Sequence, residues 1–203
     1  MLHKFLYQVR NWRAHWRALW LGTSRTDEVD TALWPTFFPH EDRSAGEGNV
    51  GVLKFEGVLS ARLIRAAGGE IDLGVLSRRV VTNAGVNYLA SDFSGGANDV
   101  NLFKFHDAGT GVTAEAVGDT DLVTPAGPTT RATGSQTNPT APQYASVGTI
   151  TYAGTLAITE HGLFSTSARA SGTLWDRSVF SAINVVNSDS IEFTYTLTIT
   201  AGG

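Results

Sequence analysis

The sequence predicts a mainly β protein: an antiparallel, jelly-roll-like β-sandwich body preceded by an N-terminal amphipathic helix and an extended arm. Three observations lead to this fold class. Charged residues make up 17% of the chain, below the roughly 25% of ordinary globular proteins. Turn-forming glycines and prolines separate short apolar runs, as they do between strands. Apolar and polar residues alternate strictly over 191–199, which is typical of a strand with one face on a core.

The first predicted element is a basic amphipathic helix over residues 1–21. Apolar side chains recur there at steps of three and four residues, and Gly22 stands where a helix C-cap glycine belongs. Basic residues lie between the apolar ones without any acidic neighbour. The helix therefore offers an interaction stripe that consists of Trp12, Trp16 and Trp20 with Arg13 and Arg17.

An extended arm is predicted between this helix and the body, which gives an N-terminal region of residues 1–49. Helical periodicity stops after residue 22, and Pro35 and Pro39 interrupt the segment. Trp34, Phe37 and Phe38 are large aromatic residues that need a protein surface to cover them. We therefore count these three among the candidate interaction residues.

Residues 50–203 form the predicted β-sandwich body. One short helix is expected near 84–93, because its apolar residues fit one helical face and Asn83 can cap it. Strands are expected wherever apolar and β-branched residues run between turn signals. They cover 50–55, 58–64, 70–82, 100–106, 145–152, 156–164, 174–183 and 190–200.

A long surface loop is predicted over residues 124–142. Four of the six prolines of the chain lie there among small polar residues. Loops of this length are usually binding or interaction segments.

Candidate catalytic groups are scarce. His106–Asp107 and Glu160–His161 are adjacent pairs on predicted strands, so their side chains point to opposite faces and at most one of Glu160 and His161 faces inward. Asp119 and Asp121 alternate as in a calcium loop, but the further ligands of such a loop are missing, and a solvated turn is the better interpretation. We therefore assign no catalytic, cofactor-binding or metal-binding residue, expect no cofactor, and do not expect an enzyme.

Composition narrows the partners further. The net charge of −4 and the absence of cysteine argue against nucleic-acid binding, zinc fingers and disulfide frameworks. No apolar run is long enough for a membrane span, and the N-terminus lacks a signal-peptide pattern. We expect the chain to be made in a cytoplasm and its N-terminal helix to pack against protein, with binding to a membrane surface as the second interpretation.

Six runs within roughly residues 70–203 form a pattern. They are Val81-Thr-Asn-Ala-Gly-Val86, Phe103-Lys-Phe-His-Asp-Ala-Gly-Thr-Gly111, Ala114-Glu-Ala-Val-Gly-Asp-Thr120, Leu156-Ala-Ile-Thr-Glu-His-Gly-Leu-Phe164, Leu174-Trp-Asp-Arg-Ser-Val-Phe180 and Asp189-Ser-Ile-Glu-Phe-Thr-Tyr-Thr-Leu-Thr-Ile199. This pattern resembles a family of structural (virion) proteins of tailed bacteriophages and prophages.

The resemblance implies a virion component that is made in the host bacterial cytoplasm and bound to the major capsid protein or to neighbouring virion proteins. A capsid decoration (cement) protein that stabilises the shell is the first expectation, because the sequence contains no collagen-like or heptad shaft. A tail, baseplate or head-fibre receptor-binding component is the alternative. A homotrimer suits a particle with threefold sites, and a monomer would serve as well. A glycan-degrading enzyme is the rival class, and it would need two carboxylates that face one another across a cleft.

Overall fold

The computed structural model describes residues 52–78, 81–95 and 98–201. The predicted N-terminal helix and arm lie outside these residues. So do all eight candidate interaction residues, which are Trp12, Arg13, Trp16, Arg17, Trp20, Trp34, Phe37 and Phe38.

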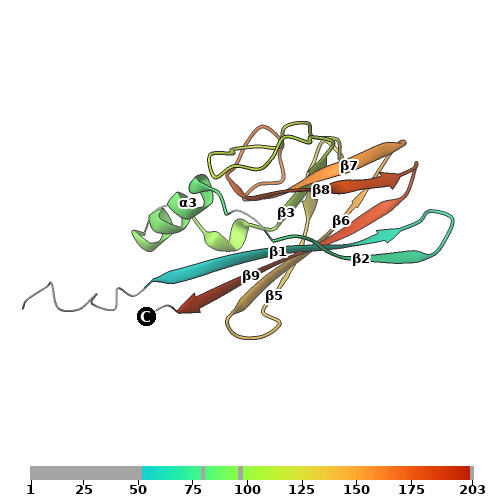
Figure 1. Ribbon diagram of the computed structural model, residues 1–203. Coiled ribbons are helices and arrows are strands. Elements are labelled where there is room, and N and C mark those ends of the chain that lie inside the picture. The colour runs from blue at the N-terminus through green and yellow to red at the C-terminus, as the bar shows by residue number, and fades with distance from the viewer. Residues whose placement is uncertain (1–51, 79–80, 96–97, 202–203) are drawn as a thin grey trace, which may run out of the picture. The chain divides into compact units, whose positions relative to one another are not determined.

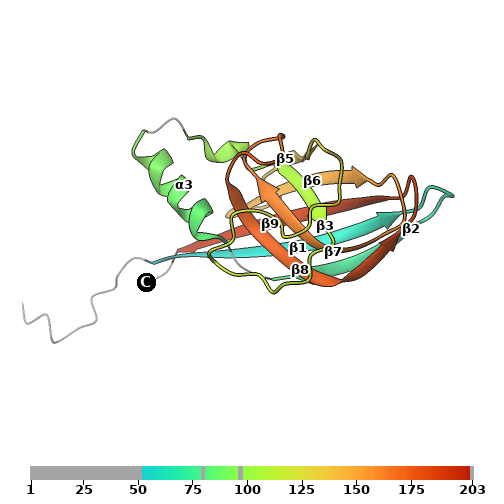
Figure 2. The ribbon, with the colours of Figure 1, turned by 90° about the horizontal axis from the view of Figure 1, so that it is seen from above.

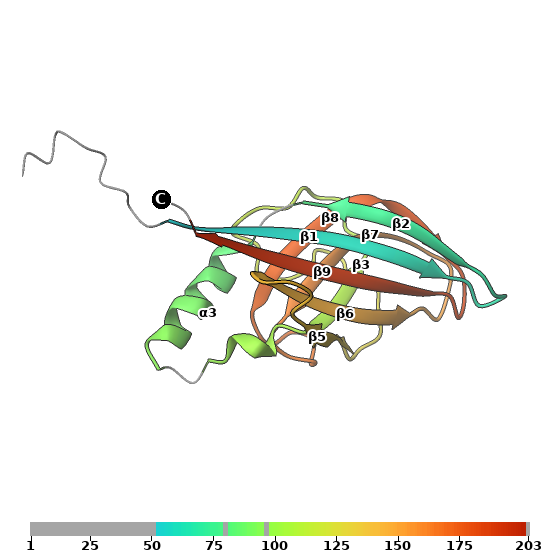
Figure 3. The ribbon, with the colours of Figure 1, turned by 90° about the horizontal axis from the view of Figure 1, so that it is seen from below.

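The described part is mainly β, with two antiparallel sheets as in the predicted sandwich (Figure 1). Sheet A has five strands, in the order β2 (Glu70–Ser77), β1 (Leu53–Ile64), β9 (Ser190–Ala201), β6 (Gln143–Thr151) and β5 (Ser135–Thr137). Figure 3 shows these strands side by side. Sheet B has four strands, in the order β4 (Ala132–Thr133), β3 (Phe105–Gly109), β7 (Leu156–Phe164) and β8 (Leu174–Val185).

The core lies between the sheets, and β9 shows how the sequence builds it. β9 pairs with β1 over the full length of both strands, and its residues alternate between buried and partly exposed. The predicted core positions Phe193, Tyr195 and Leu197 are buried, and Ile199 is partly buried against the same cluster. The core-face prediction for the last strand is therefore confirmed. Sheet B contributes the opposing side chains, among them Ile158, Leu163, Ile183 and Val185.

β1 corrects one prediction. The two strands expected at 50–55 and 58–64 are one continuous strand, with Gly57 in its interior. A Cβ at Gly57 would lie 2.6 Å from the Tyr195 hydroxyl oxygen, so a side chain there would collide with the core. Gly57 therefore marks a close contact between side chain and backbone, and the strand does not end there.

The only α-helix of the described residues, α3 (Asn83–Phe93), starts one residue before its predicted range, and its cap differs from the prediction. Thr82 is the N-cap: its Oγ1 accepts a hydrogen bond from Gly85 N–H and donates one to the Leu174 carbonyl. Tertiary contact selects this cap, since Thr82 also binds β8 through its hydroxyl and through its backbone N–H, which donates to the Trp175 carbonyl. A Cβ at Gly85 would lie 2.9 Å from the Trp175 ring, so this glycine allows the helix to seat on β8.

Two further predictions change between α3 and β6. The strand expected at 100–106 is a 3₁₀ helix, η1 (Val100–Leu102), followed by β3, because the Asp99 carboxylate accepts a hydrogen bond from Asn101 N–H and closes a helical turn. The loop expected at 124–142 contains β4 and β5, which pair with β3 and β6. Strands of two and three residues have too little periodicity to be seen in the sequence.

Candidate functional site

Buried polar side chains gather on sheet B. His106 and Asp107 on β3 and Glu160 and His161 on β7 are all 0–1% exposed. The expectation that at most one of Glu160 and His161 faces the interior is therefore wrong. Sheet B is covered on both faces, by sheet A on one and by the loop between β3 and β4 on the other, which Figure 2 shows running over the sheet. Adjacent residues do point to opposite faces, but neither face is open to water.

Glu160 fastens the covering loop to sheet B. Its carboxylate accepts hydrogen bonds of 2.7–3.1 Å from the backbone N–H groups of Gly111, Val123 and Thr124. Arg177 on β8 approaches the same carboxylate with Nε at 3.0 Å and Nη2 at 2.9 Å. Arg177 also binds the Asp119 carboxylate at 2.9 Å and the Thr113 carbonyl at 3.0 Å. We call this network the Glu160 clasp. It compensates the burial of two charges with hydrogen bonds from several segments.

A second network, the Asp107 clasp, holds the loop after β7. The Asp107 carboxylate binds Arg169 through two hydrogen bonds, of 2.7 Å to Nη2 and 3.0 Å to Nε. Arg131 Nε lies 3.5 Å from the same carboxylate, and its guanidinium carbon lies 3.5 Å from the centroid of the Phe164 ring. Arg131 also donates to three backbone carbonyls, those of Thr166, Ala168 and Ser171. Arg131 therefore holds the backbone of this loop in place, and Arg169 ties the loop to β3 through Asp107.

A histidine pair lies between the two sheets. His106 Nδ1 is 3.0 Å from His161 Nε2, and His106 Nε2 is 2.8 Å from the Ser146 hydroxyl on β6. Burial lowers the pKa of His106 to about 3 and lowers the pKa of His161 well below its usual value, with the neighbouring His106 adding to the second shift. Both rings are therefore neutral at physiological pH and serve as polar links across the core.

Asp176 does not form a pair with Glu160. It precedes Arg177 on β8, so its side chain points to the opposite face of sheet B and approaches Gly57 of sheet A. It is 1% exposed and accepts a hydrogen bond from the Ser178 hydroxyl. Burial raises the pKa of Asp176 to about 7. The two carboxylates that a glycosidase would need therefore do not face one cleft.

The buried polar side chains of sheet B therefore hold strands and covering loops together. A general acid, base or nucleophile must come within hydrogen-bond distance of its substrate, and Glu160, His106, His161 and Asp176 are covered by protein. Asp119 closes an exposed turn, as the sequence predicts, because its N–H donates to the Ala116 carbonyl, and its carboxylate also pairs with Arg177. Within the described ranges no group of three or more metal-ligating side chains is present.

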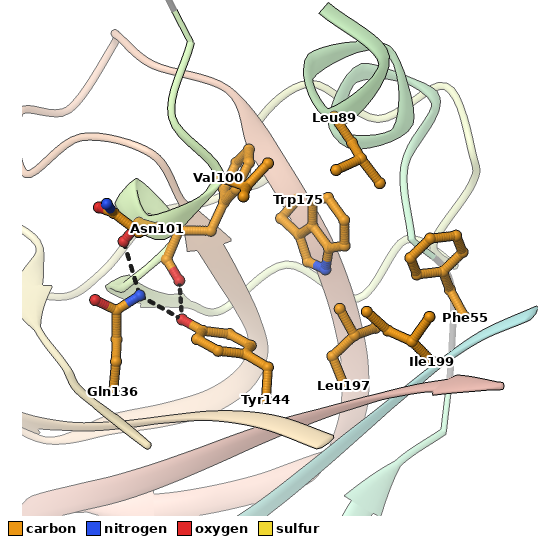
Figure 4. A pocket seen from close by; sticks show the side chains of 10 residues that line it. Phe55, Leu89, Val100, Asn101, Gln136, Tyr144, Trp175, Leu197 and Ile199 are labelled. Carbon is orange, nitrogen blue, oxygen red and sulfur yellow. Dashed lines mark hydrogen bonds between the residues drawn. The ribbon is translucent and has the colours of Figure 1, made fainter. Parts of the chain in front are cut away.

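Among the described residues, one accessible feature is an apolar pocket of about 270 Å³ beside α3 (Figure 4). Five parts of the body contribute to it: α3, η1, the start of β1 with the end of β9, the adjacent strands β5 and β6, and β8. Its apolar wall comprises Phe55, Leu89, Val100, Phe103, Trp175, Leu197 and Ile199. The remaining lining residues are Asn101, Gln136 and Tyr144.

The polar groups of the pocket bind each other. Gln136 Nε2 donates to the Asn101 carbonyl at 2.7 Å and to the Tyr144 hydroxyl at 3.0 Å, and that hydroxyl donates to the Phe103 carbonyl. The Trp175 indole N–H is likewise satisfied by the Tyr195 hydroxyl at 2.9 Å. No carboxylate, imidazole, amine or guanidinium lines the pocket. It is therefore suited to an uncharged apolar group, which it would hold by shape and dispersion.

The sequence does not reveal this pocket. Its lining residues are spread from Phe55 to Ile199, and none of them belongs to a motif for binding. The available signals are an aromatic residue beside a turn, such as Phe103, and a tryptophan in a predicted strand, Trp175; both are equally typical of an ordinary core.

Comparisons with protein-family models, with curated proteins and with solved structures find no match to this chain. Among the described residues no helix is long and apolar enough to cross a membrane.

Proposed function

We propose that this chain is a virion structural protein of a tailed bacteriophage, and within that class a capsid decoration protein that binds across neighbouring capsid subunits and stabilises the shell. The observation that carries the proposal is the use of the buried charges. The Glu160 and Asp107 clasps join loops to sheet B through eleven named hydrogen bonds. A body held in this way keeps one shape, as a component of a particle must.

The residues behind the phage resemblance support the same role. Four of the resembling runs contain members of the clasps: 103–111 holds Asp107, 114–120 holds Asp119, 156–164 holds Glu160, and 174–180 holds Arg177. At these four positions the resemblance concerns residues that hold the body together.

The jelly-roll-like form of the sandwich belongs to this proposal. In chain order, β7 and β8, which pair in sheet B, lie between β6 and β9, which pair in sheet A. A jelly roll is built from strand pairs that are nested in this way. A homotrimer with the major capsid protein as its partner is proposed for the assembled state.

In this proposal the N-terminal tryptophans anchor the protein to its neighbours. Replacing Trp12 and Trp16 with serine should weaken incorporation into particles at least 30-fold, as loss of an interface hot spot does. Thermal unfolding of the purified variant reports whether the body stays folded. Incorporation at the wild-type level would contradict the anchoring role. Tight binding of the isolated helix to liposomes would favour the membrane interpretation.

The decisive experiment is an averaged electron-microscopy image of particles that carry a tag on this chain. Tag density that repeats over the capsid lattice supports a decoration protein, and particles without the chain should then break at lower temperature. Density at the tail end or baseplate would favour the receptor-binding alternative instead. Particles without tag density would overturn the virion assignment.

A further inference from the structure

We propose that the apolar pocket of one copy receives the indole side chain of Trp34 from a second copy of this chain. The inference rests on the part of the proposed function in which copies of the chain join one another. Trp34 itself lies outside the described residues, so its role is argued from its sequence, from the chemistry of the pocket and from the place where the described chain begins.

The volume of the pocket suits an indole better than a single phenyl ring. A dry apolar cavity of about 150 Å³ binds benzene. The pocket encloses about 270 Å³, so a single phenyl ring would leave much of it empty, whereas the two fused rings of an indole fill it better. Among the aromatic residues of the uncharged stretch 31–39, only Trp34 carries two rings.

The pocket and the segment that carries Trp34 both lack charged side chains. The pocket has no ionisable side chain besides Tyr144, and burial raises the pKa of that phenol, so it stays neutral. Residues 31–39, between Asp30 and His40, contain no charged residue. Trp12, Trp16 and Trp20 instead have arginines nearby, at Arg13 and Arg17. Those arginines would lose water at this pocket without gaining a carboxylate.

Two prolines follow Trp34 in the sequence and restrict the backbone of its segment. Trp34 precedes Pro35, and Pro39 follows four residues later. Proline-containing segments favour an extended conformation and dock into aromatic-lined grooves at low entropic cost. Phe55, Phe103, Tyr144 and Trp175 provide such aromatic walls. The pocket and the segment therefore match in chemistry and in the kind of recognition they permit.

The chain between Trp34 and the body is long enough to reach the pocket of another copy. The described chain begins at Val52, three residues before Phe55 of the pocket wall. From Trp34 to Val52 the chain spans at most roughly 60 Å when fully extended. A compact body of about 150 residues is roughly 40 Å across. The length of chain before the body is thus sufficient to place Trp34 at the pocket of an adjacent copy.

The test uses the full-length chain and sedimentation equilibrium at concentrations up to about 1 mM. Leu89→Trp fills the pocket of its own copy, and Trp34→Ala removes the occupant. Each variant alone should raise the dissociation constant for self-association about 30-fold, as loss of an interface hot spot does. An equimolar mixture of the two should associate more tightly than either alone, because an intact Trp34 on one copy meets an open pocket on the other.

Matched controls isolate the two sites. Asn87→Trp puts the same side chain on an exposed position of α3, two residues from Leu89 and therefore on the other side of the helix. Leu33→Ala shortens an apolar side chain of the uncharged stretch and keeps Trp34. Both should associate within about threefold of wild type. If circular dichroism shows that Leu89→Trp does not fold, Val100→Trp fills the pocket from η1 instead.

Several results would overturn the proposal. A wild-type chain that stays monomeric throughout the concentration range has no such joint. Two variants that associate as wild type does would show that the pocket and Trp34 do not meet, and a mixture that associates no better than its parts would exclude exchange between copies. Free indole should compete with self-association; indole that binds and leaves association unchanged would assign the pocket to a small molecule. The particle image can fail while this joint forms in solution, so the two proposals fail separately.

Discussion

β9 and β7 are both interior strands of their sheets, yet only β9 reveals its burial in its sequence. From Ser190 to Thr198, β9 alternates between partly exposed and buried residues, because its outer face meets water. β7 is buried at every position from Ile158 to Phe164, because loops cover the face that sheet A does not. Apolar and polar residues therefore alternate along a strand when only one of its faces is buried. A strand that is buried on both faces does not show this alternation.

The ion pairs on the outer face of sheet A and on the covered face of sheet B differ in the same way in their exposure to water. On the outer face of sheet A, Arg62 bridges Glu70 and Glu192 while its side chain is 42% exposed. On the covered face of sheet B, the Glu160–Arg177 pair is 0–1% exposed. Water screens the Arg62 network, whereas protein covers the Glu160–Arg177 pair, so equivalent substitutions should have different consequences. The predictions below test this contrast, from the largest effect to the smallest.

Glu160→Gln should lower the free energy of unfolding by about 3–5 kcal/mol, because it leaves Arg177 buried without its main counter-charge. Glu192→Gln, the matched change on sheet A, should cost less than about 1 kcal/mol. Urea-induced unfolding measures both. Equal losses would show that the two faces do not differ in covering.

Leu197→Ala should cost about 2–5 kcal/mol, because it opens a cavity in the core. Its neighbour Thr196 points to the outer face of sheet A, and Thr196→Ala should cost about 0.5 kcal/mol or less. The same unfolding experiment compares them. A costly Thr196→Ala would mean that another element covers this face.

The buried histidines predict that stability falls in acid. The unfolded chain takes up a proton at His106 below its ordinary pKa of 6.5, whereas the folded chain does so only near pH 3. The unfolding free energy should therefore decrease from pH 6.5 towards pH 3, by about 1.4 kcal/mol per pH unit for this group, or about 2 kcal/mol at pH 5. His161 shifts in the same direction.

Asp176 acts in the opposite direction. Its pKa is raised to about 7, so the folded chain retains a proton that the unfolded chain releases above 3.8. This contribution is complete below 3.8 and is lost as the pH rises towards 7. Asp176→Asn removes it, so the variant should gain stability more steeply than wild type between pH 4 and pH 6.5. Parallel pH profiles from calorimetry would argue that Asp176 is ionised in the fold.

The smallest contrast uses two threonines. Thr159 on β7 is buried, and its hydroxyl donates to the Gly111 carbonyl at 2.8 Å. Thr159→Val should cost about 1–2 kcal/mol, because that carbonyl loses its partner. Thr196→Val should leave the unfolding free energy nearly unchanged, since valine suits an outer strand position. Guanidinium unfolding at one pH measures both variants, and equal costs would remove the distinction between the faces.

Much of sheet A follows from sequence. The period-two pattern over 191–199 predicts the core face of β9, and a short helix is expected within one residue of the observed start of α3. These features depend on contacts that every second or every third to fourth residue makes with one core, so a local pattern records them. The break expected between residues 55 and 58 fails because the role of Gly57 is set by Tyr195, which is distant in the chain.

The composition and patterning of the sequence by themselves determined a mainly β body and the inward face of its last strand. Only the tertiary structure decided that both faces of sheet B are covered, that Asp107 meets Arg169 across 62 positions of the chain, and that residues from Phe55 to Ile199 line one pocket. The physical reason is that periodicity reports how one segment faces a core. Which distant segments then meet depends on the strand order of the sheets and the course of the loops, and no local pattern contains that information.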